Sequence, residues 1–326
     1  MINSEAKLSD KLFHDDIPQA PTRNGYGEGL VAAGKENPNV VVLCADLTES
    51  TRSLAFKEAF PERFIEAGIS EQNMADVAAG LAKYGKIPFI SSYATFSPGR
   101  NWEQIRTTVA YNNVPVKVGG AHAGISVGPD GGTHQALEDL AIMRALPNMT
   151  VIAPADSIET RKATLAASRT NTPVYLRFAR EATPVFTTDG SPFEIGKAVV
   201  LREGKDVALI GAGPLLYNAL LAAEQLAQKG IDAAVVDSHT VKPLDEETIL
   251  RVAGTTKRVV SVEEHQVIGG LGSALAELFA KKMPIPMEFI GVQDRFGESG
   301  EPQELLEAFG MGVGSIVQAI ERVMQR

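Results

Sequence analysis

The sequence has little cysteine, no long apolar run and no cluster of basic charge. Cys44 is the only cysteine among 326 residues, so no internal disulfide can form and the reducing cytoplasm is the expected compartment. No apolar run approaches the ~18 residues of a membrane helix. The segment Met1–Lys7 also lacks the apolar core of a signal peptide. With a net charge of -9, the chain is not expected to bind nucleic acid or a membrane.

Short apolar runs alternate with segments of helical periodicity, which is typical of α/β proteins. Hydrophobic residues make up 44% of the chain, enough for about two domains with their own cores. Continuous apolar strands separated by helices indicate parallel sheets covered on both faces. The sequence therefore predicts two consecutive three-layer α/β domains with mainly parallel sheets. The expected strands are 40–45, 63–67, 87–92, 114–118, 149–153, 174–178, 207–210, 233–236, 258–262 and 287–290, and the expected helices are 70–84, 101–111, 135–146, 157–167, 215–228, 273–281 and 316–324.

The boundary between the two domains is expected where this alternation lapses. Between Arg180 and Gly196 the chain is rich in Thr, Pro, Asp, Gly and Ser. We place the first domain at 23–187 and the second at 188–326. Residues 1–22 are mixed and polar, and we interpret them as an arm that packs late or on a partner.

A Gly-rich run from His122 to Gln135 is the stretch richest in reactive groups. It contains two histidines, a carboxylate, hydroxyls and an amide, and its four glycines with Pro129 exclude a regular helix. The run follows an expected strand, and such loops are where open α/β sheets bind ligands. A long connection without function would have the same composition, so other segments must decide between the two interpretations.

Two more candidate residues follow expected strands. Glu71 falls in the first turn of a helix, where the helix dipole favours a carboxylate. Most such glutamates only cap the helix, but a partly buried one can also exchange a proton with a heterocycle nitrogen. Phe96, with Trp102 shortly after it, suits stacking on a flat ligand or filling a core.

Several cationic and polar residues in expected loops form a candidate phosphate site. Taken singly, each is best explained as a surface or salt-bridging residue. Together they could hold a phosphate through bidentate and point contacts. They are Arg23, Ser50, Arg100, His122 and Arg180.

In this order, the residues resemble the transketolase family. The likeness is carried by Glu71 in Gly-Ile-Ser-Glu, by Thr95-Phe96 and by the run Asp130-Gly-Gly-Thr-His-Gln135. Further matches are Arg23, Ala45-Asp-Leu-Thr48 with Ser50, Ala179-Arg180 and the segment 235–245. The resemblance covers about residues 22–326, in the pyrimidine-binding and C-terminal domains of that family.

The resemblance implies a transketolase that uses thiamine diphosphate and moves a two-carbon ketol unit from a ketose phosphate to an aldose phosphate, as in the pentose phosphate pathway. Glu71 would bond the aminopyrimidine nitrogen and so promote loss of the thiazolium proton. Phe96 would stack on the pyrimidine. Asp46 and Trp102 are further expected cofactor contacts, while Asp130 and His134 would act on sugar oxygens and Arg23, Ser50, His122 and Arg180 would hold the sugar phosphate.

The resemblance also implies a missing half. Full-length relatives carry an N-terminal domain with a Gly-Asp-Gly run and, further on, paired asparagines, which bind the diphosphate through a divalent metal. We find no such run in this sequence. We therefore expect a separate N-terminal subunit to hold Mg²⁺ and the diphosphate, no metal ligands in this chain, and two such heterodimers paired as α2β2.

Three alternatives stay open. A 2-oxo acid dehydrogenase β subunit has the same layout, although it would not be expected to carry the element from Asp130 to His134. A deoxyxylulose-phosphate-synthase-like fragment shares the Glu71 context but not the match at Asp46 and Ser50. A non-catalytic assembly subunit could keep the fold, which the intact Glu71, Asp130 and His134 speak against.

Overall fold

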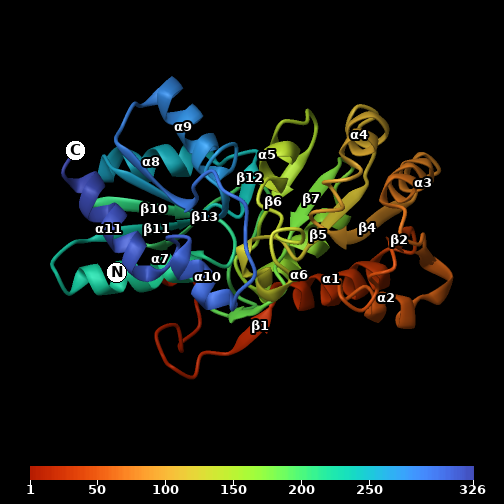
Figure 1. Ribbon diagram of the computed structural model, residues 1–326, viewed down its shortest axis with the longest axis horizontal. Helices are drawn as coiled ribbons and strands as arrows, with labels where there is room; N and C mark the ends of the chain where they lie inside the picture. The colour runs from red at the N-terminus through yellow and green to blue at the C-terminus, as the bar shows by residue number, and fades with distance from the viewer.

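The computed structural model describes residues 1–326 as two α/β domains side by side (Figure 1). The first sheet has seven strands in the order β12-β6-β7-β5-β4-β2-β3, and the second has five in the order β14-β13-β10-β11-β9. The predicted fold class is confirmed. The strands are β1 (Gln19–Pro21), β2 (Val40–Cys44), β3 (Phe64–Glu66), β4 (Ile87–Tyr93), β5 (Lys117–Ala121), β6 (Thr150–Ile152), β7 (Val174–Arg177), β8 (Ala182–Pro184), β9 (Val199–Arg202), β10 (Val207–Gly211), β11 (Ala233–Asp237), β12 (Thr240–Lys242), β13 (Val259–Gln266) and β14 (Met287–Val292).

Helices cover both faces of each sheet. In the first sheet, Val41 and Leu43 of β2 face one apolar core while Val40 and Val42 face another, because successive side chains of a strand point to opposite faces. The helices are α1 (Thr22–Glu36), α2 (Leu54–Ala59), α3 (Glu71–Lys83), α4 (Trp102–Gln104), α5 (Asp139–Arg144), α6 (Ser157–Ser168), α7 (Leu216–Ala227), α8 (Glu246–Thr256), α9 (Leu271–Lys282), α10 (Pro302–Ala308) and α11 (Val313–Met324). No helix is long and apolar enough to cross a membrane.

Three expected elements differ from the structure. The strand expected at 114–118 is β5, which begins three residues later and includes Gly119 and Gly120. The helix expected at 135–146 is only α5, because Gln135 turns its side chain back into the preceding loop. The helix expected at 101–111 is α4 followed by a π-helical segment, Ile105–Ala110.

Helix α1 was not expected, since four glycines stand in a span of ten residues. These glycines are what lets the helix pack closely. A Cβ at Gly25 would lie 1.8 Å from the carbonyl oxygen of Ser157, and one at Gly29 would lie 2.5 Å from Thr164 Cβ. Helix α1 therefore lies directly on α6, and this contact fixes the position of Arg23 in its first turn.

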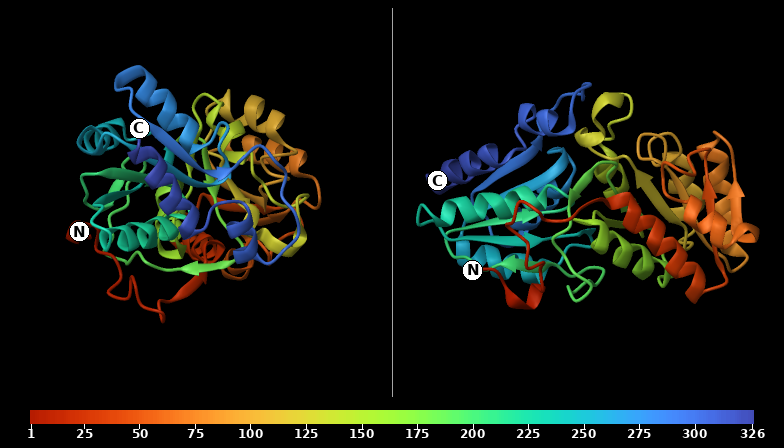
Figure 2. Two further views of the ribbon diagram at one scale, coloured as in Figure 1. Left: turned by 60° about the vertical axis from the view of Figure 1, so that its left-hand side comes forward. Right: turned by 90° about the horizontal axis from the view of Figure 1, so that it is seen from below.

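The N-terminal arm, which we expected to pack late or on a partner, packs on the chain's own second domain in this structure (Figure 2). Its strand β1 pairs antiparallel with β8, and the backbone N–H of Asn3 donates to Leu201 O at 2.9 Å. Leu12 and Ile17 are buried in the core of the second domain. The arm thus ties the two domains together before the chain enters α1.

Strand β12 is a second tie between the domains. It follows the second-domain strand β11 along the chain, yet it pairs antiparallel with β6 at the edge of the first sheet. Sequence reasoning also missed the edge strand β9, the helix α8 and the short helix α10. The junction between the sheets is therefore built from both halves of the chain.

Candidate active site

The predicted site residues follow strands that end at one edge of the first sheet. His122 comes directly after β5, Phe96 comes three residues after β4, and Arg180 comes three residues after β7. These strands run parallel, so their carboxyl ends meet at the same edge. Glu71 begins α3 shortly after β3 at that edge. The topology thus gathers side chains that are far apart in sequence.

Glu71 is a buried carboxylate, only 1% exposed. Its Oε2 accepts from Arg100 Nη1 at 2.8 Å, and its Oε1 accepts from Ser92 Oγ at 3.4 Å. Its backbone carbonyl accepts from Asn101 Nδ2 at 3.0 Å. A buried charge of this kind needs a cation or several donors, and here a single arginine provides most of the compensation.

Arg100 connects Glu71 to Phe96. Its guanidinium carbon lies 4.8 Å from the centroid of the Phe96 ring, while Nη1 holds the Glu71 carboxylate. The Arg100 side chain is 49% exposed, so this contact is reached from the solvent. A flat, hydrogen-bond-donating group lying over Phe96 is therefore able to reach Glu71.

Beyond Phe96, aromatic and imidazole rings form a continuous series. The Phe96 and His134 rings meet edge to face with centroids 5.5 Å apart. Tyr93 stacks on His122 at 3.8 Å and lies 6.0 Å from Phe96. Tyr93 was missed among the candidate residues, although it stands at the end of the same strand three residues before Phe96.

The predicted phosphate-binding residues form a cluster with excess positive charge. Arg23 Nη1 donates to Ser50 O at 3.0 Å and lies 3.5 Å from His122 Nε2. Burial, followed by the charges of Arg52 and Arg180, lowers the pKa of Arg23. Arg23 Nε and His122 Nδ1 are buried without a hydrogen-bond partner. These unpaired groups suit an anionic ligand.

His122 is neutral at physiological pH. Burial lowers its pKa to about 3, and the neighbouring charges of Arg23 and Arg180 act in the same direction. The residue also adopts a left-handed backbone conformation, with φ of 55°. Such strain at a strand end is common at ligand sites. His122 therefore offers a neutral donor or acceptor, not a cation.

Arg180 links this positively charged cluster to the Gly-rich loop. Its Nη1 donates to Val127 O at 2.8 Å and lies 3.7 Å from Asp130 Oδ1. Within the same loop, His134 Nδ1 lies 2.9 Å from Thr133 Oγ1, and Thr95 Oγ1 donates to His134 O at 3.3 Å. Asp130 and His134 thus lie between Arg180 on one side and Phe96 on the other.

Two expected cofactor contacts make other contacts in the structure. Trp102 Nε1 donates to Ile142 O at 3.0 Å, and its ring packs against the apolar core below, so this side chain joins α4 to α5. The backbone N–H of Asp46 donates to Glu66 Oε1 at 2.8 Å, and its side chain is exposed. Ser50, in turn, meets Arg23 through its carbonyl and not its hydroxyl.

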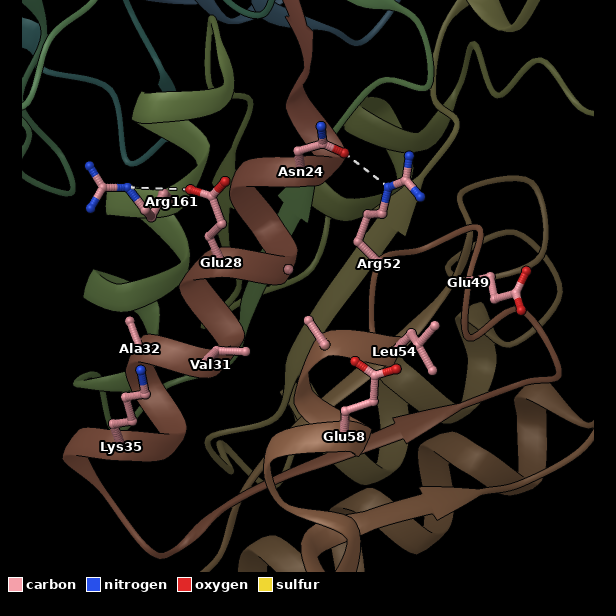
Figure 3. Close-up of a pocket in the computed structure, with 12 residues that line it drawn as sticks. Asn24, Glu28, Val31, Ala32, Lys35, Glu49, Arg52, Leu54, Glu58 and Arg161 are labelled. Carbon is pink, nitrogen blue, oxygen red and sulfur yellow. Dashed lines mark hydrogen bonds and ion pairs between the residues drawn. The ribbon is translucent and has the colours of Figure 1, made fainter.

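Arg52 is a further cation that sequence reasoning missed. Figure 3 shows it directed toward Asn24, whose Oδ1 accepts from Arg52 Nε at 2.9 Å. Both residues line a surface hollow of about 760 Å³ between α1 and α2, beside the positively charged cluster around Arg23. Arg52 has a φ of 65° in the structure. The only signal for it in the sequence was its position two residues after the predicted Ser50. No group of three or more His, Cys, Asp and Glu side chains is arranged to hold a metal ion.

Comparison with protein families gives two matches that together span most of the chain. The model described as transketolase, pyrimidine binding domain, matches residues 19–185. The model described as transketolase, C-terminal domain, matches residues 196–316. Apart from β12, which pairs with the first sheet, these ranges follow the two sheets and most of their helices.

Similar proteins include a section and a subunit of transketolases and a split gene transketolase. A protein described as a transketolase C-terminal section from Methanocaldococcus jannaschii is 45% identical over 307 residues, which covers 93% of this chain and 96% of that protein. A 6-deoxy-6-sulfo-D-fructose transketolase subunit from a Clostridium species is 42% identical, over 93% of this chain and 94% of that one. Among solved structures, an inactive β4 tetramer of a split gene transketolase matches with a TM-score of 0.88 and 46% identity, over 94% of this chain and 98% of that one.

Proposed function

This chain belongs to the transketolase family, and we propose that it is the C-terminal subunit of a split transketolase, active with an N-terminal partner subunit. The reaction is transfer of a two-carbon ketol unit from a ketose phosphate to an aldose phosphate. The complex is an α2β2 assembly of the cytoplasm, where the single buried thiol of Cys44 stays reduced.

One observation carries the proposal. The buried Glu71 carboxylate is reached by a flat donor group, the Arg100 guanidinium, that lies over the Phe96 ring. An aminopyrimidine of thiamine diphosphate has the same two requirements, a carboxyl group at its ring nitrogen and an aromatic face below. The residues present therefore fit this cofactor.

The chain's own groups have distinct tasks. Thiamine diphosphate, when bound, supplies the carbanion chemistry at its thiazolium carbon. Glu71 holds a proton at the ring nitrogen, and its burial keeps water from competing for that contact. Phe96 supports the ring from one side. The partner subunit supplies most of the diphosphate and Mg²⁺ binding.

The sugar lies between the cofactor ring over Phe96 and the cluster around Arg23, against the Gly-rich loop. Asp130 and His134 bind its hydroxyl and carbonyl oxygens, and His134 stays near Phe96 through the edge-to-face contact. Arg23, His122 and Arg180 hold the distal phosphate, because they combine two cations with a neutral imidazole. The Ser50 hydroxyl is free to join them, since the carbonyl alone meets Arg23.

A second donor deserves the same assay. The Clostridium relative acts on 6-deoxy-6-sulfo-D-fructose, as its description states. A terminal sulfonate would meet the same arginines as a terminal phosphate, although it carries one charge fewer at neutral pH. Competition between a sugar phosphate and a sulfo sugar shows which of these two donors the complex prefers.

The proposal is tested by reconstitution. The chain is co-expressed with an N-terminal transketolase subunit, supplied with thiamine diphosphate and Mg²⁺, and assayed for ketol transfer from fructose 6-phosphate and from 6-deoxy-6-sulfo-D-fructose. We expect activity when both subunits are present together and no activity from either subunit by itself. A complex that carries the exposed Glu103→Gln substitution should be as active as the wild-type complex. Decarboxylation of pyruvate, or transfer by this chain without a partner, would contradict the proposal.

A further inference from the structure

The second domain contacts the Gly-rich loop of the first through the end of strand β13. Three consecutive ionisable residues there, Glu263, Glu264 and His265, are at most 4% exposed. Glu263 accepts from the backbone N–H groups of Leu271 and Gly272 and so caps α9. Glu264 points the other way, into the first domain. A buried carboxylate so placed needs a reason outside its own domain.

Glu264 binds the beginning of the loop. Its Oε1 accepts from the backbone N–H of Ser126 at 2.6 Å. The backbone packs so closely that a Cβ on Gly124 would lie 2.2 Å from the same oxygen. Gly124 has a φ of 97°, a conformation that other residues rarely adopt. The carboxylate therefore sets the course of the chain where it leaves β5.

The end of the loop is held through Arg177. Arg177 Nη2 donates to the backbone carbonyl of Glu264 at 2.8 Å and to Ala136 O at 3.3 Å. Its Nε pairs with Asp139 at 2.8 Å, and Tyr175 donates to the same carboxylate oxygen at 2.7 Å. The residue at the tip of β13 thus fixes both ends of the loop, through its side chain and its carbonyl.

A second segment of the same domain, residues 297–302, closes on the loop from outside. Gln135 Nε2 donates to Glu298 O at 2.9 Å. A Cβ on Gly132 would lie 2.7 Å from Gly297 O, and one on Gly128 would lie 3.0 Å from Pro302 Cγ. In Figure 1 the blue chain leading into α10 descends at this junction between the two domains. The second domain therefore contacts the loop at Gly128, Gly132 and Gln135, while Asp130 stays exposed between them.

We propose that Glu264 is a positioning residue for the donor sugar: the second domain, through this carboxylate, holds the loop that carries Asp130 and His134. The inference rests on the proposed function for its substrate. A loop with four glycines has no preferred shape of its own, so its ligand-binding geometry must come from outside contacts. This gives the C-terminal domain a task at the active site in addition to assembly.

Three variants test the proposal. Glu264→Ala removes the acceptor for the Ser126 N–H, and Glu264→Gln keeps an acceptor oxygen in its place. Glu277→Ala is the control, because it removes an ion pair between the two domains, with Arg144 at 3.2 Å, that does not touch the loop. The first measurement is hydrogen exchange at the Ser126 amide in the isolated chain, and it needs neither partner nor cofactor.

We expect exchange at Ser126 to be about tenfold faster or more in Glu264→Ala and near wild type in the other two variants. In the reconstituted complex, Glu264→Ala should raise the donor KM by about tenfold or more while exchange of the thiazolium proton changes far less, because that exchange depends on Glu71, which lies outside the loop. Glu264→Gln should restore the donor KM.

Unchanged Ser126 exchange together with an unchanged donor KM in Glu264→Ala would overturn the inference. If Glu264→Ala does not fold, Gln135→Met loosens the loop instead, because the Gln135 amide donates to Ile125 O and Gly128 O within the loop and to Glu298 O of the second domain. This variant must show the same rise in donor KM, or the inference fails. A wild-type complex without ketol transfer would refute the proposed function instead, and the Ser126 exchange would still decide whether Glu264 holds the loop.

Discussion

At the scale of single residues, Arg100 makes both contacts expected of the cofactor's pyrimidine. It pairs with Glu71 and lies over Phe96, so it must move before a ring nitrogen reaches that carboxylate. Replacing Arg100 by Ala should therefore tighten thiamine diphosphate binding to the assembled complex. We expect a gain of up to about fivefold, because a half-exposed ion pair is worth about 1 kcal/mol or less.

Calorimetric titration of the reconstituted complex measures this change. Arg100→Lys is the control, since it keeps the charge near Glu71 but loses the flat group over Phe96. Weaker binding in Arg100→Ala would mean that Arg100 helps to hold the cofactor rather than excluding it.

The sequence predicted which residues gather at the sheet edge better than it predicted their contacts. Glu71, Phe96, His122, His134 and Arg180 come together because each follows a strand of one parallel sheet, and strand ends are recognisable in a sequence. The contacts of Trp102 with Ile142 depend on where its ring turns, which spacing does not encode. Arg52 was missed for the same reason, since one exposed arginine in a loop resembles any other.

At the scale of elements, two buried carboxylates are neighbours, Glu159 of helix α6 and Asp237 of strand β11. Burial, then the neighbouring charge of Asp237, raises the pKa of Glu159, and burial raises that of Asp237. The pair therefore retains a proton at neutral pH. Because the folded chain binds that proton more tightly than the unfolded chain, the free energy of unfolding falls as pH rises from the ordinary carboxyl range through the raised pKa.

Asp237→Asn should weaken this dependence, because the amide keeps the shape of the side chain without the charge, while burial alone still raises the pKa of Glu159. We expect the variant to be more stable than wild type at about pH 8, by on the order of 1–3 kcal/mol, and not at about pH 4.5. Urea unfolding at both pH values measures this, with the exposed Asp10→Asn as control. An equal effect at the two pH values would show that the pair does not share a proton in the folded chain.

The elements themselves were predicted where apolar runs are uninterrupted. Strands β2, β10 and β11 are such runs up to their last residue, and all three lie in sheet interiors. Helix α1 and strand β5 were misjudged because of glycines that only the packing explains. A Cβ on Gly120 would lie 2.2 Å from Tyr175 Oη, a contact between neighbouring strands that no local pattern reveals.

At the scale of the whole molecule, the two domains act as one unit around the sheet edge. The arm, strand β12 and the tip of β13 each cross from one domain to the other. The domain order was predictable from the alternation of strands and helices. These crossings were not, because they depend on contacts between segments that are far apart in the sequence, such as Thr240 with Ile152 and Glu264 with Ser126.

The central claim is that the Glu71 carboxyl group activates a cofactor whose diphosphate is held by another chain. The most direct test is exchange of the thiazolium proton for deuterium in the reconstituted complex, comparing wild type with Glu71→Gln. The account predicts fast exchange in wild type and a loss of about 100-fold or more in a Glu71→Gln complex that still assembles. Equally fast exchange in that variant would contradict it.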